Sequence, residues 1–154
     1  MFDPNQFMSS AVDPMNTQME VVPEGDYRFL IDGDPKQLTP KNLKGISQRT
    51  NEPYDFWQIE LLCFCLDDAV KQKLGRDKVT VRLRLNLDLD ATGRLEVGAN
   101  KNIGLGQLRD ALGQNKPGWS PQMLLGAGPF IGKVKHNTTD KGTFADIQRV
   151  ARIS

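Results

Sequence analysis

The segment from Lys78 to Asp90 alternates between apolar and polar side chains without a single error. Its apolar positions are Val79, Val81, Leu83, Leu85, Leu87 and Leu89. Its polar positions are Thr80, Arg82, Arg84, Asn86 and Asp88. Successive side chains of a strand point to opposite faces, so this pattern predicts an antiparallel strand with one face in a core and one in solvent. The chain is therefore expected to build a β-sheet with a covered face.

Other segments indicate further strands and short helices. Branched and aromatic runs predict four more strands, at 25–34, 54–66, 129–137 and 144–153. Capping residues and a helical apolar period predict helical segments at 67–75, 102–114 and 119–125. Residues 35–53 contain three prolines and are predicted to form a long loop.

The order of these elements constrains the fold class. A helical insertion between the third and fourth of five strands is typical of the OB-fold, a partly open Greek-key barrel. We therefore predict a mainly β protein, with a five-stranded OB-fold-like barrel and short helices over residues 25–154. A two-sheet sandwich is the alternative, because strand number alone does not separate the two.

Residues 1–24 differ from the rest in composition. They contain three prolines, four acidic residues and no basic residue, and they show no sustained helical or strand period. We interpret them as a flexible, extended acidic arm. Residues 1–34 as a whole carry a net charge of −6, and the remaining 120 residues carry +7. An acidic arm thus precedes a basic body.

Several function classes lack the residues they would need. Cys63 and Cys65 are two residues apart in an apolar run and far from His136, the only histidine, so no metal site and no catalytic cluster is expected. The glycines of GAGPFIGKV have the wrong spacing for a phosphate-binding loop. No apolar run is long enough to cross a membrane, and no signal peptide is seen. We expect a cytoplasmic protein that is not an enzyme and has no cofactor.

The polar side of the predicted barrel carries aromatic and basic residues together. Alternation over 54–66 places Trp57, Ile59, Leu61 and Cys63 on the core side and leaves Tyr54 and Phe56 outside. Bases stack on exposed rings while cations follow phosphates. The candidate DNA-binding residues are Tyr54, Phe56, Arg82, Arg84, Lys133, Lys135, Lys41, Lys44 and Arg49.

Four stretches also suggest a relationship: VPEGDYRFLIDG, FWQIELLCFCL, MLLGAGPFIGKV and GTFADIQRV. Over residues 21–153 the chain resembles the OB-fold single-stranded-DNA-binding proteins of bacteriophage replication and recombination modules. The resemblance implies a protein that binds single-stranded DNA without strong sequence preference and protects it in the bacterial host cell. Many proteins of that kind end in an acidic tail, whereas this chain ends ARIS and carries its acidic segment at the N-terminus.

Alternatives remain open at this point. The same barrel could serve as a protein-interaction module, such as a phage accessory or anti-defence factor without nucleic-acid binding, or as a structural component without a ligand. The acidic arm could recruit replication or recombination proteins or compete with DNA for the basic face. It could also pack on the barrel or on a neighbouring subunit of a homo-oligomer.

Overall fold

The alternating segment forms the strand it predicts. In the computed structural model, which describes residues 1–15 and 20–153, β4 runs from Thr80 to Leu87 with every second side chain buried. It pairs along its length with the longest strand, β3 (Pro53–Cys65), in antiparallel register from Trp57↔Leu87 to Phe64↔Thr80. Leu89, the last apolar position of the pattern, forms an isolated bridge with Leu95 beyond the strand.

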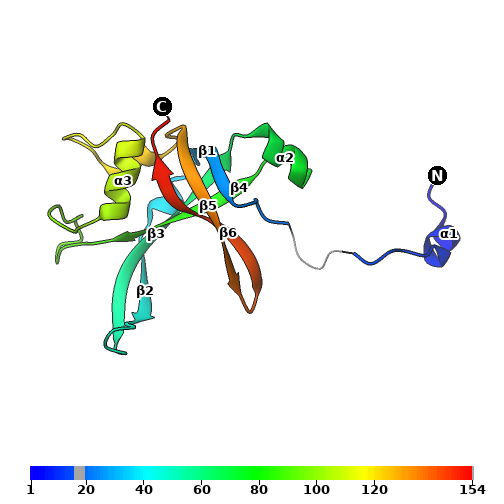
Figure 1. Cartoon of the computed structure of the whole chain (residues 1–154), viewed down its shortest axis with the longest axis horizontal. Helices are drawn as coiled ribbons and strands as arrows, with labels where there is room; N and C mark the ends of the chain where they lie inside the picture. Colours follow the sequence, from blue (N-terminus) through cyan, green and yellow to red (C-terminus); the bar gives the residue numbers. More distant parts are fainter. Residues whose placement is uncertain (16–19, 154) are drawn as a thin grey trace.

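Five strands close into a ring (Figure 1). Besides β3 and β4, they are β1 (Gly25–Ile31), β5 (Phe130–Thr139) and β6 (Gly142–Ala151). Antiparallel pairs join β1 to β3 and to β5, and β5 to β6, and one parallel pair, Arg82↔Asp146, joins β4 to β6 and completes the circle. All of these strands belong to one sheet, so the sandwich alternative is wrong and the mainly β prediction is confirmed.

A sixth strand corrects the prediction of a long loop over 35–53. This segment contains a 3-10 turn, η1 (Pro35–Leu38), and the strand β2 (Lys41–Ile46), which pairs with the first half of β3 from Lys41↔Gln58 to Ile46↔Pro53. Because β4 ends opposite Trp57, the β2–β3 hairpin extends beyond the ring (Figure 1). The sequence does not predict this strand because its lysines and glycine are poor strand formers and give no apolar alternation. Its pairing with β3 stabilises it instead.

The core fills the ring with side chains from all five of its strands. Phe29, Leu61, Phe130 and Val134 are fully buried together with both cysteines. Gly132 of β5 is required by this packing, because a Cβ there would lie 2.7 Å from the ring of Phe29. The aromatic ring thus fills the place of the missing side chain.

Helical segments lie where the sequence predicts them. They are α2 (Asp68–Leu74), α3 (Ile103–Ala111) and a 3-10 turn, η2 (Pro121–Leu124). Gly75 ends α2 in the left-handed conformation with φ +64°. Asp67 precedes α2 as expected, but its carboxylate accepts a hydrogen bond from the Arg28 amide at 2.9 Å instead of capping the helix. Helix α3 buries Leu105, Leu108 and Ala111 against the ring.

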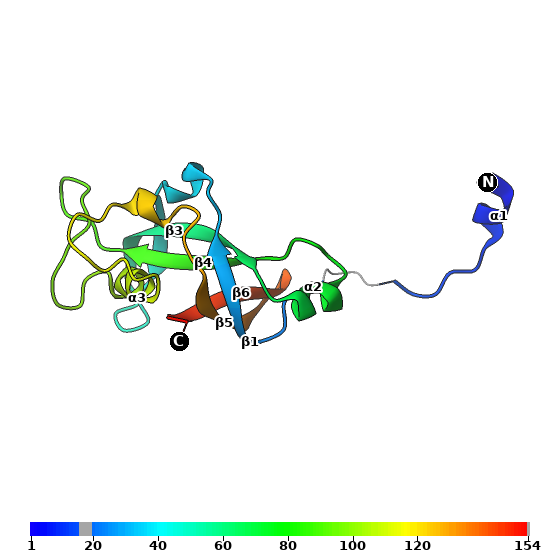
Figure 2. The ribbon, with the colours of Figure 1, turned by 90° about the horizontal axis from the view of Figure 1, so that it is seen from above.

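The N-terminal segment has two parts. Residues 1–15 lie away from the ring (Figures 1 and 2) and contain a short helix, α1 (Pro4–Ser9), that the sequence did not predict; Asp3 caps it and Pro4 begins it. Residues 20–24, which we had assigned to the arm, contact the ring instead. Val22 is buried, and its carbonyl accepts a hydrogen bond from His136 Nε2 at 2.7 Å. We call residues 20–24 the strap.

Candidate nucleic-acid interface

The solvent side of β3 and β4 forms one continuous surface. Side chains that face each other across an antiparallel pair lie on the same side of the sheet. The pairs Gln58↔Asn86, Glu60↔Arg84 and Leu62↔Arg82 therefore share one face, and the Gln58 side-chain amide donates to Asn86 Oδ1 at 2.9 Å. We call this surface the outer face.

Two aromatic rings extend the outer face onto the hairpin. Tyr54 and Phe56 are on the same side of β3 as Gln58, and their ring centroids lie 5.7 Å apart at an interplanar angle of 35°. Tyr54 is 49% exposed, and Phe56 is half-buried. The close approach of Tyr54 to the facing strand requires Gly45, since a Cβ there would lie 2.8 Å from the tyrosine ring. The structure thus presents two neighbouring rings on one surface.

Trp57 corrects the expected division of β3 into a core side and an outer side. It lies on the same side of β3 as the buried Ile59 and Leu61, as expected, but it is 38% exposed and does not belong to the core. The reason is its position opposite Leu87 at the end of β4, where the hairpin leaves the ring. Alternation along the strand predicts the side on which Trp57 lies. The core does not cover that side at Trp57, because β4 ends opposite this residue.

The two arginines of the outer face differ in their partners. Arg84 Nε donates to Glu60 Oε1 at 3.0 Å, and Arg84 Nη1 lies 3.4 Å from Asp146 Oδ2. Arg82 makes no ion pair and no side-chain hydrogen bond with any residue that the structure describes. Since carboxylates neutralise Arg84, Arg82 offers the more available charge to a phosphate.

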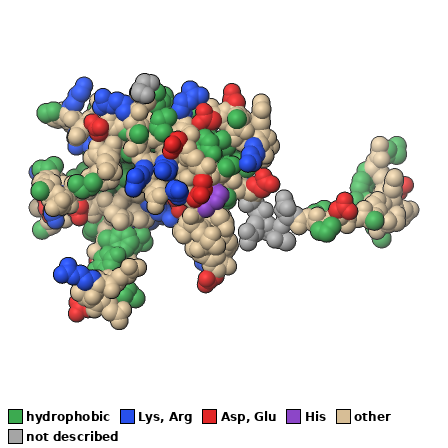
Figure 3. Space-filling model, in the orientation of Figure 1, with side chains coloured by type: hydrophobic (Ala, Val, Ile, Leu, Met, Phe, Trp, Pro, Cys, Tyr) green, Lys and Arg blue, Asp and Glu red, His purple; other side chains and the backbone are tan. Residues whose placement is uncertain are grey.

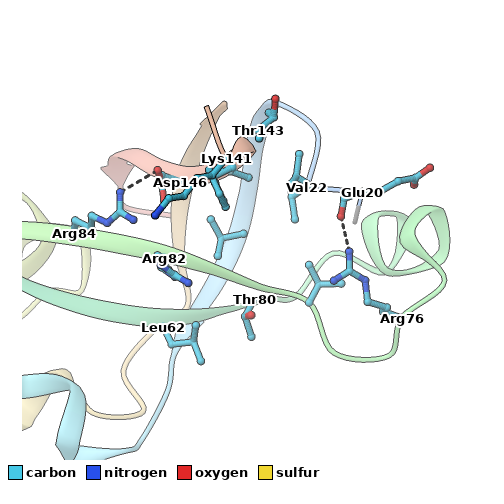
Figure 4. A pocket seen from close by; sticks show the side chains of 16 residues that line it. Glu20, Val22, Leu62, Arg76, Thr80, Arg82, Arg84, Lys141, Thr143 and Asp146 are labelled. Atoms are coloured by element: carbon cyan, nitrogen blue, oxygen red, sulfur yellow. Dashed lines mark hydrogen bonds and ion pairs between the residues drawn. The ribbon is translucent and has the colours of Figure 1, made fainter. Parts of the chain in front are cut away.

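A groove of about 530 Å³ continues the outer face between β4 and the β5–β6 hairpin (Figure 4). It lies where the ring is joined by a single parallel pair. The bases that line it are Arg76, Arg82, Arg84 and Lys141, and its acids are Glu20 and Asp146. Arg76 Nη2 donates to the carbonyl of Glu20 at 2.7 Å, which holds the strap at one end of the groove. The groove therefore has an excess of positive charge.

The predicted basic residues do not all lie on this surface. Lys41 pairs with Gln58 on the outer face, whereas Lys44 pairs with Asp55 on the opposite side of the hairpin, and Arg49 lies in the turn between the two strands. Lys133 and Lys135 alternate with buried residues on β5 and point outward. Lys135 is the register partner of Asp146, which in turn is the partner of Arg82.

Sequence reasoning missed three residues that line the groove. Arg76 follows α2, while Lys141 and Phe144 belong to the turn and strand of the β5–β6 hairpin. Phe144 is 45% exposed. The segment TTDKG joins the strands predicted at 129–137 and 144–153. A lysine in it is followed closely by a phenylalanine, and this repeats the pairing of base and aromatic seen on β3 and β4.

The cysteines show no sign of reactivity. Cys63 and Cys65 are free and buried, and burial raises the pKa of the Cys63 thiol to about 12. Over residues 1–15 and 20–153, no cluster of three metal-ligating side chains is found. No helix in these same ranges is long and apolar enough to cross a membrane.

No protein-family model matches the chain, and neither a curated protein nor a solved structure matches it. What the protein does must therefore be inferred from the outer face and the groove.

Proposed function

We propose that the five-stranded ring is an OB-fold and that the protein binds single-stranded DNA along the outer face and the groove. In ring order the strands are β1, β3, β4, β6 and β5, with α3 between β4 and β5 in the chain. OB-folds bind oligonucleotides on the face of their second and third strands, and with the loops that join the first to the second and the fourth to the fifth. Here these would be β3 and β4, residues 32–52, and the turn with Lys141.

One observation supports this function most strongly: two neighbouring aromatic rings share a single strand-pair face with an arginine that has no ion-pair partner among the described residues. Tyr54 and Phe56 offer flat surfaces for bases, and Arg82 offers a cation for the backbone. Stacking contributes about 1–3 kcal/mol per base and tolerates any sequence. Binding without strong sequence preference is therefore expected.

The biological role follows the sequence resemblance. We infer a phage protein without enzymatic activity or cofactor that acts in the cytoplasm of a bacterial host cell and protects single strands during replication or recombination. Replication or recombination enzymes remain candidate partners of the N-terminal arm.

A salt titration with a labelled oligonucleotide tests the proposal. Affinity should fall steeply as salt rises, because bound phosphates release their counterions. The double variant Arg82→Ala/Arg84→Ala should bind more weakly and with a flatter slope. The control is Arg94→Ala, which removes an exposed arginine that follows β4 and does not line the groove, and it should behave as the parent does. If the parent protein does not bind the oligonucleotide at low salt, the protein-interaction module becomes the better interpretation.

A further inference from the structure

The groove between β4 and β6 lies where two parallel strands separate from each other. Over the described residues they are joined at one position only, Arg82↔Asp146. On the C-terminal side of this pair, α3 packs against both strands. On the N-terminal side lies the groove, with residues 79–82 on one wall and residues 141–146 on the other. The two strands therefore separate here without a further strand between them.

Both walls of the groove are unpaired strand edges. Residues 142–145 pair with β5 alone, and Thr80 and Val81 pair with β3 alone. Among the described residues, no backbone hydrogen bond joins the strap to either edge. The hairpin of β5 and β6 projects from the body of the molecule (Figures 1 and 3). An unpaired edge presents a row of free N–H and C=O groups, which the backbone of another extended chain can satisfy.

The side chains beside these edges alternate between the core and the solvent. Ala145 packs against the core, whereas its neighbour Phe144 is 45% exposed. On the other wall Val81 is buried, and Arg82 belongs to the outer face. A strand added between them would direct every second side chain inward, toward Val81, Ala145 and the buried Val22 of the strap. Small apolar side chains suit these inward positions.

The outward positions of an added strand would meet basic residues. Among the groove-lining charges, Asp146 lies 3.4 Å from Arg84, so these two neutralise each other. The bases that remain are Arg76, Arg82 and Lys141, and the acid that remains is Glu20. Because three positive charges stand against one negative charge, acidic side chains suit the outward positions.

We propose that the groove binds an extended peptide of a partner protein, which adds as a strand along the edge of β6. Its side chains alternate between small apolar residues, which face the core, and acidic residues, which face Arg82 and Lys141. The peptide site does not depend on the proposed function. One consequence does: because Arg82 serves both ligands, the peptide and DNA should exclude each other from the groove.

Amide hydrogen exchange on the full chain tests the site with a synthetic peptide. The probe has about six residues, a usual strand length, and alternates valine with aspartate. At high peptide concentration, we expect the edge amides of residues 80–81 and 142–145 to exchange several times more slowly. The strand β2 is the internal control, because it pairs with β3 alone and so also has an unpaired edge. Equal slowing in β2, or no slowing along the groove, would overturn the proposal.

Two altered peptides separate the backbone contact from the charge contact. A peptide with the same side chains but N-methylated amides keeps its charges and cannot complete the strand pairing, so it should bind several times more weakly. A peptide with lysine in place of aspartate should also bind several times more weakly. If either altered peptide binds as tightly as the probe, the proposed mode of binding is wrong.

A charge reversal on the protein provides a matched pair of variants. Lys141→Glu should weaken binding of the aspartate peptide several-fold and strengthen binding of the lysine peptide, since Lys141 lines the groove. Lys116→Glu is the control, because Lys116 is an exposed lysine in the loop after α3 that does not line the groove. It should bind both peptides as the parent does. Equal effects of the two substitutions would contradict the assignment of the acidic side chains to Lys141.

An oligonucleotide titration separates this proposal from the proposed function. If the oligonucleotide binds and the peptide does not, the peptide site is wrong and the proposed function stands. If the peptide slows exchange along the groove and no oligonucleotide binds at low salt, the proposed function is wrong and the peptide site stands. If both bind, the peptide should release the oligonucleotide, and simultaneous binding would overturn the expected exclusion at Arg82.

Discussion

Arg84 and Glu60 form an ion pair across the β3–β4 strand pair, with Arg84 Nε 3.0 Å from Glu60 Oε1. Asp146 of β6 lies 3.4 Å from the same guanidinium, so two carboxylates share this charge. Arg82 lies two residues earlier on the same face and has no such partner among the described residues. Two arginines that are equivalent in the sequence pattern therefore differ in the charge that they can offer to a phosphate.

Arg82→Ala should accordingly weaken single-strand binding more than Arg84→Ala does. Losing one phosphate contact flattens the logarithmic salt dependence by about 0.7 for a single strand, and this change is expected for Arg82→Ala. Arg84→Ala should change the slope less, since it removes a charge that is already neutralised. Anisotropy titrations of both variants over a range of salt concentrations measure the difference. Equal slopes for the two variants would contradict this ranking.

Substitutions on the two sides of the β2–β3 hairpin should differ in their effect on DNA affinity. Tyr54→Ala should weaken DNA binding by about 1–3 kcal/mol, because its exposed ring offers a stacking surface. Trp57→Ala should leave DNA affinity unchanged, since Trp57 lies on the opposite side of the same strand. Its exposure also means that the variant should lose less stability than the ~3–5 kcal/mol typical of a core aromatic. Binding titrations and thermal melts of both proteins test the assignment, and loss of binding in Trp57→Ala would reverse it.

Most of the ring could be predicted from the sequence because its strands bury alternate side chains. The perfect alternation of β4 predicted both its existence and its orientation, and Arg82 and Arg84 indeed lie outside. The prediction failed where pairing rather than local pattern stabilises a strand. β2, with the sequence KNLKGI, has no apolar alternation of its own and is stabilised by its register with β3.

The candidate site was only partly predictable for a related reason. The side on which Tyr54, Phe56 and Arg82 lie could be predicted, because successive side chains of β3 and of β4 alternate between the two faces of the sheet. The groove depends on how β4 and the β5–β6 hairpin lie side by side, a long-range relation that joins Arg82 to Asp146 through a single pair. Lys44 was included among the candidate DNA-binding residues because of its charge alone, and only its register with Asp55 shows that it lies on the opposite side of the hairpin.

The strap should stabilise the ring, whereas residues 1–15 should not. Val22 is 4% exposed, so Val22→Ala should reduce the free energy of unfolding by roughly 1–3 kcal/mol through lost burial and a residual cavity. Val12→Ala is the matched control, because Val12 is largely exposed and its truncation should change stability by less than about 0.5 kcal/mol. Denaturant unfolding of the two variants compares them directly. A similar loss in both would show that the burial of Val22 does not contribute to stability.

Glu24 should make the strap sensitive to acid. Its Oε2 accepts a hydrogen bond from the His136 amide at 2.9 Å, and this bond is the main reason that the pKa of Glu24 is lowered from its ordinary 4.5. A carboxylate with a lowered pKa in the folded state stabilises that state fully above its unfolded pKa, and the stabilisation is lost as pH falls through the folded pKa. The attachment of the strap is therefore expected to be complete near neutral pH and to weaken only in the acid range below 4.5.

Glu24→Gln isolates this contribution, because an amide oxygen can still accept the hydrogen bond from His136 but does not titrate in this range. The parent should melt at a higher temperature than the variant near neutral pH, and the difference should shrink as pH falls through the acid range. Asp90→Asn controls for a general effect of removing a carboxylate. The pKa of Asp90 is also lowered, mainly by a hydrogen bond from the Thr92 hydroxyl, but Asp90 lies in a turn that does not contact the strap. Limited proteolysis within residues 20–24 distinguishes the loss of the Glu24 carboxylate from the loss of a carboxylate elsewhere. Acid should increase cleavage of this segment in the parent and in Asp90→Asn. In Glu24→Gln the cleavage should not depend on pH. If cleavage in Glu24→Gln rises with acid as it does in the parent, then the hydrogen bond from His136 to Glu24 does not control the strap.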